Sequence, residues 1–224
     1  MALSIAVDGP VGAGKSTAAR ELARRLGILH LDTGAMYRAV GLAALEAGVN
    51  LDDMRAIERV NESTDVSVTF EDGTQRTWLN GRDVSGVVRT PLASMAASMV
   101  STVGGVRAVM VKRQRAIACQ MGAVLDGRDI GTRVLPDAQF KFYLTASPEI
   151  RAKRRMDELR AKGDMQPFER VLTDVIERDL RDSTREIDPL RPASDAIIID
   201  TSDMTLDEEV ERMMEIMGPN VYYE

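Results

Sequence analysis

The 224-residue chain has very little cysteine, histidine or aromatic side chain, and it has no long hydrophobic run. Its single cysteine, Cys119, excludes an internal disulfide and a cysteine-rich metal site, which favours a reducing compartment. Its single histidine, His30, excludes a multi-histidine zinc site and argues against a histidine-based triad, so a structural role is favoured for it. Short apolar runs predict no membrane span, and the N-terminus predicts no signal peptide.

The composition is otherwise that of an ordinary globular protein, with 44% hydrophobic and 29% charged residues. The net charge is −6 and aromatic residues make up only 4% of the chain. Nucleic-acid-binding proteins are usually basic and often stack bases on aromatic rings, so this composition argues against nucleic-acid binding. A chain of this length predicts one domain, with room for inserted lobes and a core that needs no disulfide.

Five short apolar segments predict a five-stranded parallel sheet. Each is nearly continuous in apolar residues, which is typical of a strand buried on both faces. The segments are residues 3–7, 28–31, 123–126, 140–145 and 196–200. Helical patterns separate them, beginning with residues 15–26 and the terminating Gly27. The alternation predicts an α/β fold with a three-layer α/β/α arrangement.

Two segments interrupt this alternation. Residues 64–85 alternate polar and apolar side chains around the turn signals Glu71-Asp72-Gly73 and Asn80-Gly81, which predicts a small antiparallel insert. Residues 149–166 carry six basic and four acidic side chains, the composition of a solvated helix face. A second interpretation of this basic segment is a short helical lid that closes arginines over phosphates.

One motif decides the class of protein. The residues Gly9-Pro10-Val11-Gly12-Ala13-Gly14-Lys15-Ser16, followed by Thr17, fit the pattern G-x-x-x-x-G-K-[ST] between a predicted strand and a predicted helix. In this context the loop amides cradle phosphates, the helix N-terminus adds positive charge, and Lys15 reaches the β- and γ-phosphates. The Ser16 hydroxyl is a candidate Mg²⁺ ligand. The motif predicts a P-loop NTPase fold and ATP binding.

A P-loop alone does not define a reaction. No Asn in the chain begins an N-K-x-D guanine-reading motif, and no L-S-G-G-Q transporter segment is present. The chain is also short for a motor. These absences favour a small kinase.

Three polar clusters predict a second anion site. They are residues 32–38, with Thr33, Tyr37 and Arg38; residues 126–129, with Asp126, Arg128 and Asp129; and residues 178–185. The first two follow predicted strands, whose carboxyl ends open into the ligand crevice of a parallel sheet. In the third, Arg178, Asp182 and Arg185 continue the apolar stripe of a predicted helix, so that stripe is expected to line a polar cleft. Asp126 is a candidate Mg²⁺ ligand with Ser16.

The segments GPVGAGKST, LDTGAMYRA, LDGRDIGT and ERDLRDSTRE together closely resemble bacterial cytidylate kinases over about residues 3–215. The resemblance implies Mg²⁺- and ATP-dependent conversion of CMP and dCMP to their diphosphates by a cytoplasmic, typically monomeric enzyme. It implies a core of about residues 1–36, 86–148 and 167–224. It also implies a nucleoside-monophosphate-binding region over about 37–85, with its insert at 64–85, and a lid at about 149–166.

The resemblance further implies roles for individual residues. Lys15, Arg128, Arg178 and Arg185 are expected to be catalytic, and Arg154 of the lid to bind ATP with the P-loop residues Gly9 to Thr17. The expected CMP-binding residues are Thr33, Tyr37, Arg38, Ser98, Arg107, Arg128, Asp129, Arg178, Asp182 and Arg185. Two alternatives stay open: a P-loop kinase for another small phosphorylated acceptor, and a non-catalytic nucleotide-binding protein. Neither nucleic acid nor membrane is expected as a partner.

Overall fold

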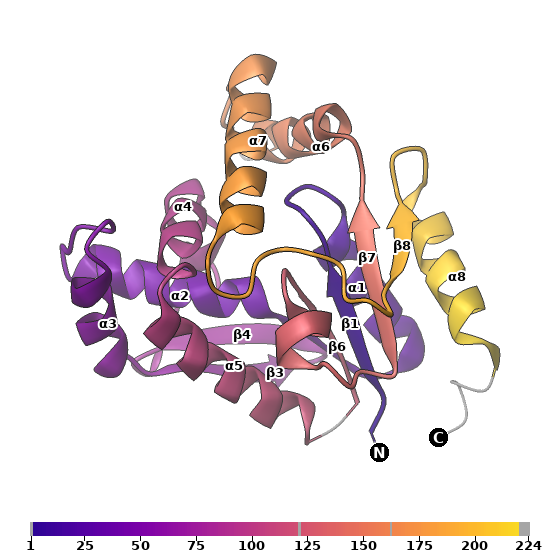
Figure 1. The fold of residues 1–224 in the computed structure, drawn as a ribbon, viewed down its shortest axis with the longest axis horizontal. Coiled ribbons are helices and arrows are strands. Elements are labelled where there is room, and N and C mark those ends of the chain that lie inside the picture. The colour runs from indigo at the N-terminus through magenta and orange to yellow at the C-terminus, as the bar shows by residue number, and fades with distance from the viewer. Residues whose placement is uncertain (1, 121, 162, 220–224) are drawn as a thin grey trace.

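The computed structural model describes residues 2–120, 122–161 and 163–219. Strands and helices alternate along most of these residues, as the sequence predicts (Figure 1). The strands are β1 (Ser4–Asp8), β2 (Leu29–Asp32), β3 (Val66–Glu71), β4 (Thr74–Leu79), β5 (Arg82–Asp83), β6 (Ala123–Gly127), β7 (Phe140–Thr145) and β8 (Ile197–Asp200). The helices are α1 (Lys15–Leu26), α2 (Thr33–Glu46), α3 (Met54–Glu62), α4 (Pro91–Val100), α5 (Gly104–Ala118), α6 (Pro148–Arg160), α7 (Phe168–Thr184) and α8 (Leu206–Met217). Short 3₁₀ and π-helical turns occupy Val87–Arg89 and Ile130–Val134.

A five-stranded parallel sheet forms the centre, in the order β2-β6-β1-β7-β8. Its strands coincide with the five predicted segments to within about one residue at each end, so the predicted α/β sheet is confirmed. The register places Asp32 beside Asp126, and Asp8 beside Gly127. The carboxyl ends of β1, β2 and β6 therefore bring three aspartates to one edge of the sheet.

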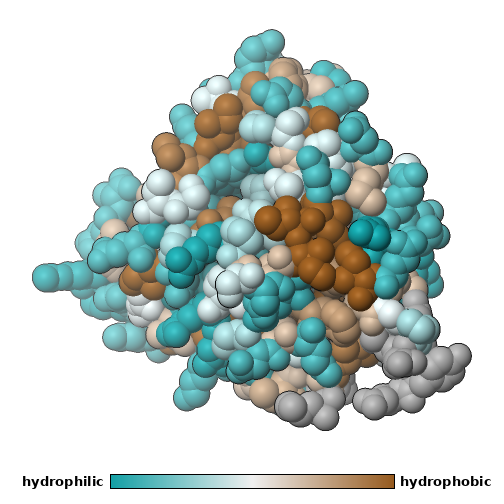
Figure 2. Space-filling model, turned by 45° about the vertical axis from the view of Figure 1, so that its right-hand side comes forward, coloured by the Kyte–Doolittle hydropathy of each residue, from teal (hydrophilic) through white to brown (hydrophobic). Residues whose placement is uncertain are grey.

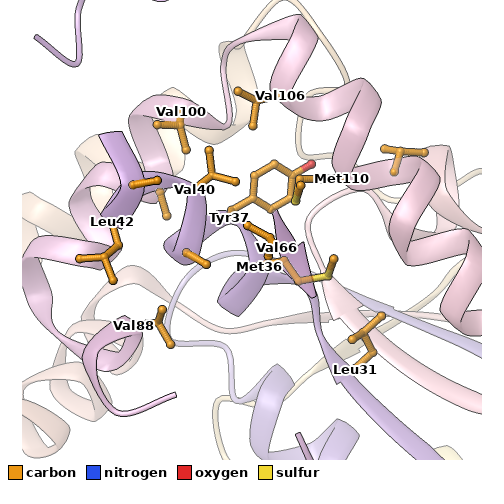
Figure 3. Packing of buried hydrophobic residues seen from close by; sticks show 14 of the residues in the cluster. Leu31, Met36, Tyr37, Val40, Leu42, Val66, Val88, Val100, Val106 and Met110 are labelled. Carbon is orange, nitrogen blue, oxygen red and sulfur yellow. The ribbon is translucent and has the colours of Figure 1, made fainter. Parts of the chain in front are cut away.

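Both faces of this sheet are covered. Ile5 and Val7 pack with α1 and α8 in one core, while the intervening Ala6 packs with α2, α4 and α5 in the other. Consecutive strand residues point to opposite faces, so a strand buried on both sides must be apolar throughout. Figure 3 shows the second core, where the ring of Tyr37 lies near Val106 and Met110.

The predicted insert is a three-stranded antiparallel sheet, in the order β3-β4-β5. Asp72-Gly73 and Asn80-Gly81 form its two turns, and all four residues have positive φ, as such tight turns require. Gln75 of β4 joins the insert to the central sheet, because its Oε1 accepts from the Asp32 amide at 2.8 Å and its Nε2 donates to the Asp32 carbonyl at 3.3 Å.

Helices α6 and α7 stand above the carboxyl ends of the strands (Figure 1). They share a small core of their own, with Ala152 and Leu159 against Val171 and Val175. Arg151 of α6 donates to the Val11 carbonyl at 3.1 Å and pairs with Asp179 of α7 at 2.6 Å. The basic segment is thus helical and lies directly over the loop that follows β1.

The edge strand β8 exposes two large apolar side chains, Ile197 and Ile198. Figure 2 shows a hydrophobic area on the side of the molecule that is turned forward in that view. Among the described residues, no single helix is long and apolar enough to cross a membrane; α4 and α5 meet that test only as a pair bent by 105°.

Candidate functional site

One cavity of about 240 Å³ lies at the carboxyl edge of the sheet. It brings together residues from the P-loop, the strand ends and α7, as the sequence predicts. The predicted site residues that line it are Val11, Gly12, Gly14, Lys15, Ser16, Thr17, Thr33, Tyr37, Arg38, Ser98, Arg107, Asp126, Arg128, Asp129, Arg178, Asp182 and Arg185. Gly9, Pro10, Ala13 and Arg154 are not among the lining residues.

The P-loop has the backbone that its glycines predict. Gly9, Gly12 and Gly14 have φ values of 146°, 76° and 85°, a region that other residues rarely adopt. A Cβ on Gly9 would lie 2.0 Å from the Leu144 carbonyl oxygen, so no larger residue fits between β1 and β7. The loop leads directly into the N-terminus of α1, whose amides and dipole favour an anion.

Lys15 is buried under this loop. Its Nζ donates to the Pro10 carbonyl at 2.5 Å, and only 5% of the residue is exposed. Burial, and then the positive charge of Arg128, lower the pKa of Lys15 well below its usual value. A negative ligand in the cavity would favour the charged ammonium.

Asp126 is the centre of a short hydrogen-bond chain behind the P-loop. Its two carboxylate oxygens contact Ser16 Oγ at 2.5 Å and His30 Nε2 at 2.7 Å. Burial alone would raise the pKa of Asp126, but the contacts to His30 and Ser16 outweigh it and the pKa is lowered. His30 therefore does not line the cavity itself. It contacts the carboxylate oxygen of Asp126 that does not contact Ser16, and it helps to keep the Asp126 carboxylate charged.

Ser16 and Asp126 suit a hard divalent cation. Mg²⁺ prefers oxygen ligands and is usually held by one or two carboxylates together with substrate phosphates and water. The adjacent hydroxyl and carboxylate provide such oxygens beside the P-loop. Within the ranges that the structure describes, no group of three or more His, Cys, Asp and Glu side chains is placed to hold a metal by itself.

Asp8, at the end of β1, anchors the loop that carries Arg128 and Asp129. Its carboxylate accepts from the amides of Ile130 at 2.8 Å and Gly131 at 2.7 Å. The residue is only 3% exposed. Burial raises its pKa to about 6, although the two amides act in the opposite direction.

Asp8→Asn is expected to change the pH dependence of stability. The folded pKa lies above the unfolded value near 3.9, so the folded state binds more protons between about pH 4 and pH 6. The Asp8 contribution to the free energy of unfolding therefore falls by roughly 2–3 kcal/mol as pH rises through that window. Urea denaturation at several pH values measures the free energy of unfolding of both proteins. The wild-type value minus the Asp8→Asn value should fall as pH rises across this window. Asp195→Asn is the control, because the hydrogen bond from Lys141 lowers the pKa of Asp195 instead of raising it. A difference in unfolding free energy between wild type and Asp8→Asn that does not change with pH would contradict the prediction.

The opposite side of the cavity begins at α2. Asp32 caps this helix by accepting from the Ala35 amide at 2.9 Å, and its other oxygen pairs with Arg38 at 2.6 Å. Arg38 Nε is buried without a hydrogen-bond partner. Thr33 Oγ1 donates to the Asp126 carbonyl at 2.7 Å, which ties the start of α2 to the end of β6.

Arg128 and Arg178 lie close together but differ in their partners. Arg128 Nε donates to Asp182 at 2.8 Å, and this pair raises the pKa of Arg128 although burial opposes the rise. Within the described residues, Arg178 Nε is buried and has no hydrogen-bond acceptor. Burial, and then the charge of Arg128, lower the pKa of Arg178 to about 10. An anion in the cavity would supply the partner that Arg178 Nε lacks.

Arg107, on α5, belongs to a further group of charged side chains beside the start of the π-helical turn. Its guanidinium contacts Asp129 through Nη2 and Asp188 through Nε at 3.0 Å, and it lies 5.7 Å from the centre of the Tyr37 ring. Arg185 lies next to it, with Nη2 at 3.5 Å from Asp129. Burial raises the pKa of Asp129, although Arg107 and Arg185 oppose the rise.

Several residues of the site were missed by the sequence analysis. Arg155 and Glu158 line the cavity and pair with each other at 2.9 Å, and Arg181 donates to the predicted residue Ser98 at 2.9 Å. Arg154 instead donates to the hydroxyl of Thr201 at 2.9 Å and to its carbonyl at 2.5 Å. Asp8, described above, was missed as well, although it ends a strand as Asp32 and Asp126 do.

A P-loop that shares one cavity with a group of arginines is the arrangement expected of a P-loop kinase. A family model described as cytidylate kinase matches residues 5–218. The chain is 49% identical over 220 residues to a cytidylate kinase of Caldanaerobacter subterraneus subsp. tengcongensis, covering 98% of this chain and 96% of that protein. It is 48% identical to a cytidylate kinase of Carboxydothermus hydrogenoformans, covering 96% of this chain and 97% of that protein. The chain belongs to the cytidylate kinase family.

A solved structure supports the fold alone. A protein of Eubacterium ventriosum, described as uncharacterized, superimposes with a TM-score of 0.52 over 97% of this chain and 98% of its own, at 13% sequence identity.

Proposed function

We propose that this protein transfers the γ-phosphoryl group of ATP to CMP or dCMP, giving ADP and CDP or dCDP. The observation that carries this proposal is the shared cavity, because the P-loop and two arginines with unpaired donors line the same space. Direct phosphoryl transfer requires little covalent chemistry from the protein. It requires that the attacking and leaving oxygens lie in line with the γ-phosphorus and that water is excluded from the site. The family membership supports the choice of substrate.

The ATP phosphates would bind the P-loop amides and the N-terminus of α1. On phosphate binding, Lys15 is expected to leave the Pro10 carbonyl and to contact the β- and γ-phosphates. Ser16 and Asp126 would hold the Mg²⁺, which neutralises phosphate charge when bound. His30 keeps Asp126 ionised and fixed in orientation for that purpose.

The acceptor phosphate would lie between Arg38 and Arg128, where it provides the partner that Arg38 Nε lacks. A phosphate oxygen of CMP attacks the γ-phosphorus as the bond from that phosphorus to the ADP oxygen breaks. Negative charge spreads over the transferred group, and Arg128 and Arg178 are placed to stabilise it. Asp182 orients Arg128 at 2.8 Å, and Arg155 on α6 lies along the same cavity wall.

The base would lie against Ser98, Arg107 and Asp129. Cytosine offers an N4 amine, which a carboxylate or hydroxyl oxygen accepts, and ring acceptors for a guanidinium. Uracil has a carbonyl in place of the amine, so its oxygen would face an acceptor. Because sites built on buried hydrogen bonds discriminate strongly, UMP is expected to have a kcat/KM at least about tenfold below that of CMP.

A coupled ADP-release assay tests the function and the base preference together. Mg-ATP is supplied with CMP, dCMP, UMP, AMP, GMP, dTMP or no acceptor. Rapid ADP release with CMP and dCMP, and slow release with the others, is the expected result. Equal efficiency with UMP would contradict the role of the base contacts, and ADP release that needs no acceptor would contradict the proposed reaction.

A further inference from the structure

Asp188, in the loop after α7, has an unusual backbone. Its φ is 48°, and among the described residues only Asp72 and Asn80 are other non-glycine residues with positive φ. Those two lie in the tight hairpin turns of the small sheet, where such angles are common. Asp188 lies in no hairpin and precedes Pro189, a position that normally favours extended backbone. An outlier of this kind persists only where its surroundings enforce it.

The contacts of Asp188 show what this conformation achieves. Its carboxylate accepts from Arg107 Nε at 3.0 Å, while its carbonyl accepts from Arg185 Nε at 2.8 Å and Nη2 at 2.5 Å. The side chain and the main chain of one residue therefore fix two different arginines of the cavity.

Arg107 depends on this contact for its orientation. The side chain is 2% exposed, and it donates hydrogen bonds to Asp188 from Nε, to the Ser101 carbonyl from Nη1 at 3.3 Å, and to Asp129 from Nη2. Asp129 and Ser101 hold only the outer nitrogens, whereas Asp188 holds the one nearest the aliphatic stem. Nη1 and Nη2 each carry a second N–H, which leaves two donors for a ligand. The guanidinium plane is fixed at three points, beside the ring of Tyr37.

We propose that Asp188 is a positioning residue for base selection, which aims the two remaining donors of Arg107 at the pyrimidine ring. This inference rests on the proposed function, because it takes Arg107 as a residue that contacts the base. Asp188 itself lines no part of the cavity, and its carboxylate reaches the cavity through Arg107, since its other partner, Arg133, does not line the cavity either. Its effect is therefore expected on acceptor binding and base choice, with little change in ATP binding.

Two substitutions separate the side chain from the backbone. Asp188→Gly removes the carboxylate but permits the same φ, so the carbonyl can still hold Arg185. Asp188→Asn also tolerates this backbone and retains an uncharged acceptor for Arg107. Asp72→Gly is the matched control, since Asp72 has φ 49° in an exposed turn and makes no contact with the cavity.

Steady-state kinetics with CMP, UMP and ATP, together with calorimetric titration of CMP in the absence of ATP, provide the test. For Asp188→Gly we expect the KM and Kd for CMP to rise about tenfold and the CMP-to-UMP ratio of kcat/KM to fall at least about tenfold. The kcat with CMP and the KM for ATP should stay within about twofold, and Asp188→Asn should recover part of the loss. Asp72→Gly should match the wild type.

Wild-type CMP affinity and base preference in Asp188→Gly would overturn the inference while leaving the proposed function intact. An equal loss in kcat, in the KM for ATP and in the KM for CMP would also overturn it, because that pattern indicates general damage to the fold. A wild-type protein that does not phosphorylate CMP would overturn the proposed function, and the positioning role would fail with it.

Discussion

Lys15→Ala is expected to lower kcat by about 10³-fold while the protein remains folded. The substitution removes the one positive charge that the P-loop itself supplies to the transferred phosphoryl group, and loss of one preorganised donor typically costs about 10²–10³ in kcat. Stability should change little, because burial and Arg128 already disfavour the charged ammonium in the free protein. The measurement is ADP release at saturating ATP and CMP, with circular dichroism and thermal unfolding of the same sample.

A second buried lysine provides the matched control. Lys141 donates to the carbonyl of Pro136, five residues before it, just as Lys15 donates to the carbonyl of Pro10. Lys141 also pairs with the Asp195 carboxylate at 2.7 Å, and it lines no part of the cavity. Lys141→Ala should therefore lower the unfolding temperature and leave kcat near that of the wild type. A Lys15→Ala variant with near-normal kcat would contradict the proposed role of the P-loop.

The sequence predicted those parts of the fold that depend on local patterns. Continuous apolar segments gave all five strands of the central sheet, and the Asn80-Gly81 signal gave a hairpin turn with positive φ at both residues. The P-loop was predictable because its glycines are required by the backbone, as the 2.0 Å approach to Leu144 at Gly9 shows. The charged end of α7 also lines the cavity, as the spacing of Arg178 and Asp182 predicts.

The pairing of side chains across the site was not predictable. Arg107 and Asp188 are 81 residues apart, His30 and Asp126 are 96 apart, and Ser98 and Arg181 are 83 apart. No periodicity links such positions, because the pairing depends on how strands and helices pack in space. His30 illustrates the limit: its place at a strand end allowed contact with the site but a structural role was favoured, and its partner is a carboxylate of the candidate site. The expected contact of Arg154 with ATP remains a prediction.

The second large effect is expected at Arg178, where activity and stability should change in opposite directions. Arg178→Met keeps an unbranched side chain in the same space but removes the charge of a half-buried guanidinium whose Nε is buried and unpaired. In the wild type the folded pKa of about 10 lies below the usual value of 12.5, because of burial and the nearby Arg128. The protonated guanidinium is thus disfavoured in the fold, and this penalty is fully present below about pH 10.

Arg178→Met is therefore expected to unfold about 2–4 °C higher than the wild type at pH 7, which corresponds to roughly 1 kcal/mol for a chain of this size. The kcat/KM for CMP should fall at least about 10²-fold, because a phosphoryl group in transfer would lose one of its charge partners. Thermal unfolding of the free protein and initial-rate kinetics measure the two effects.

Arg128→Met is the informative counterpart, since it removes the neighbouring arginine from the same cavity. Arg128 is paired with Asp182 at 2.8 Å, and Asp182 is only 4% exposed. Breaking this pair leaves a buried carboxylate without its partner, which costs roughly 3 kcal/mol. Both variants should lose turnover, but Arg128→Met should unfold at a lower temperature than the wild type. If Arg178→Met is also destabilised, then Arg178 contributes to the fold of the free protein, and the anion-binding role drawn from its unpaired donor fails.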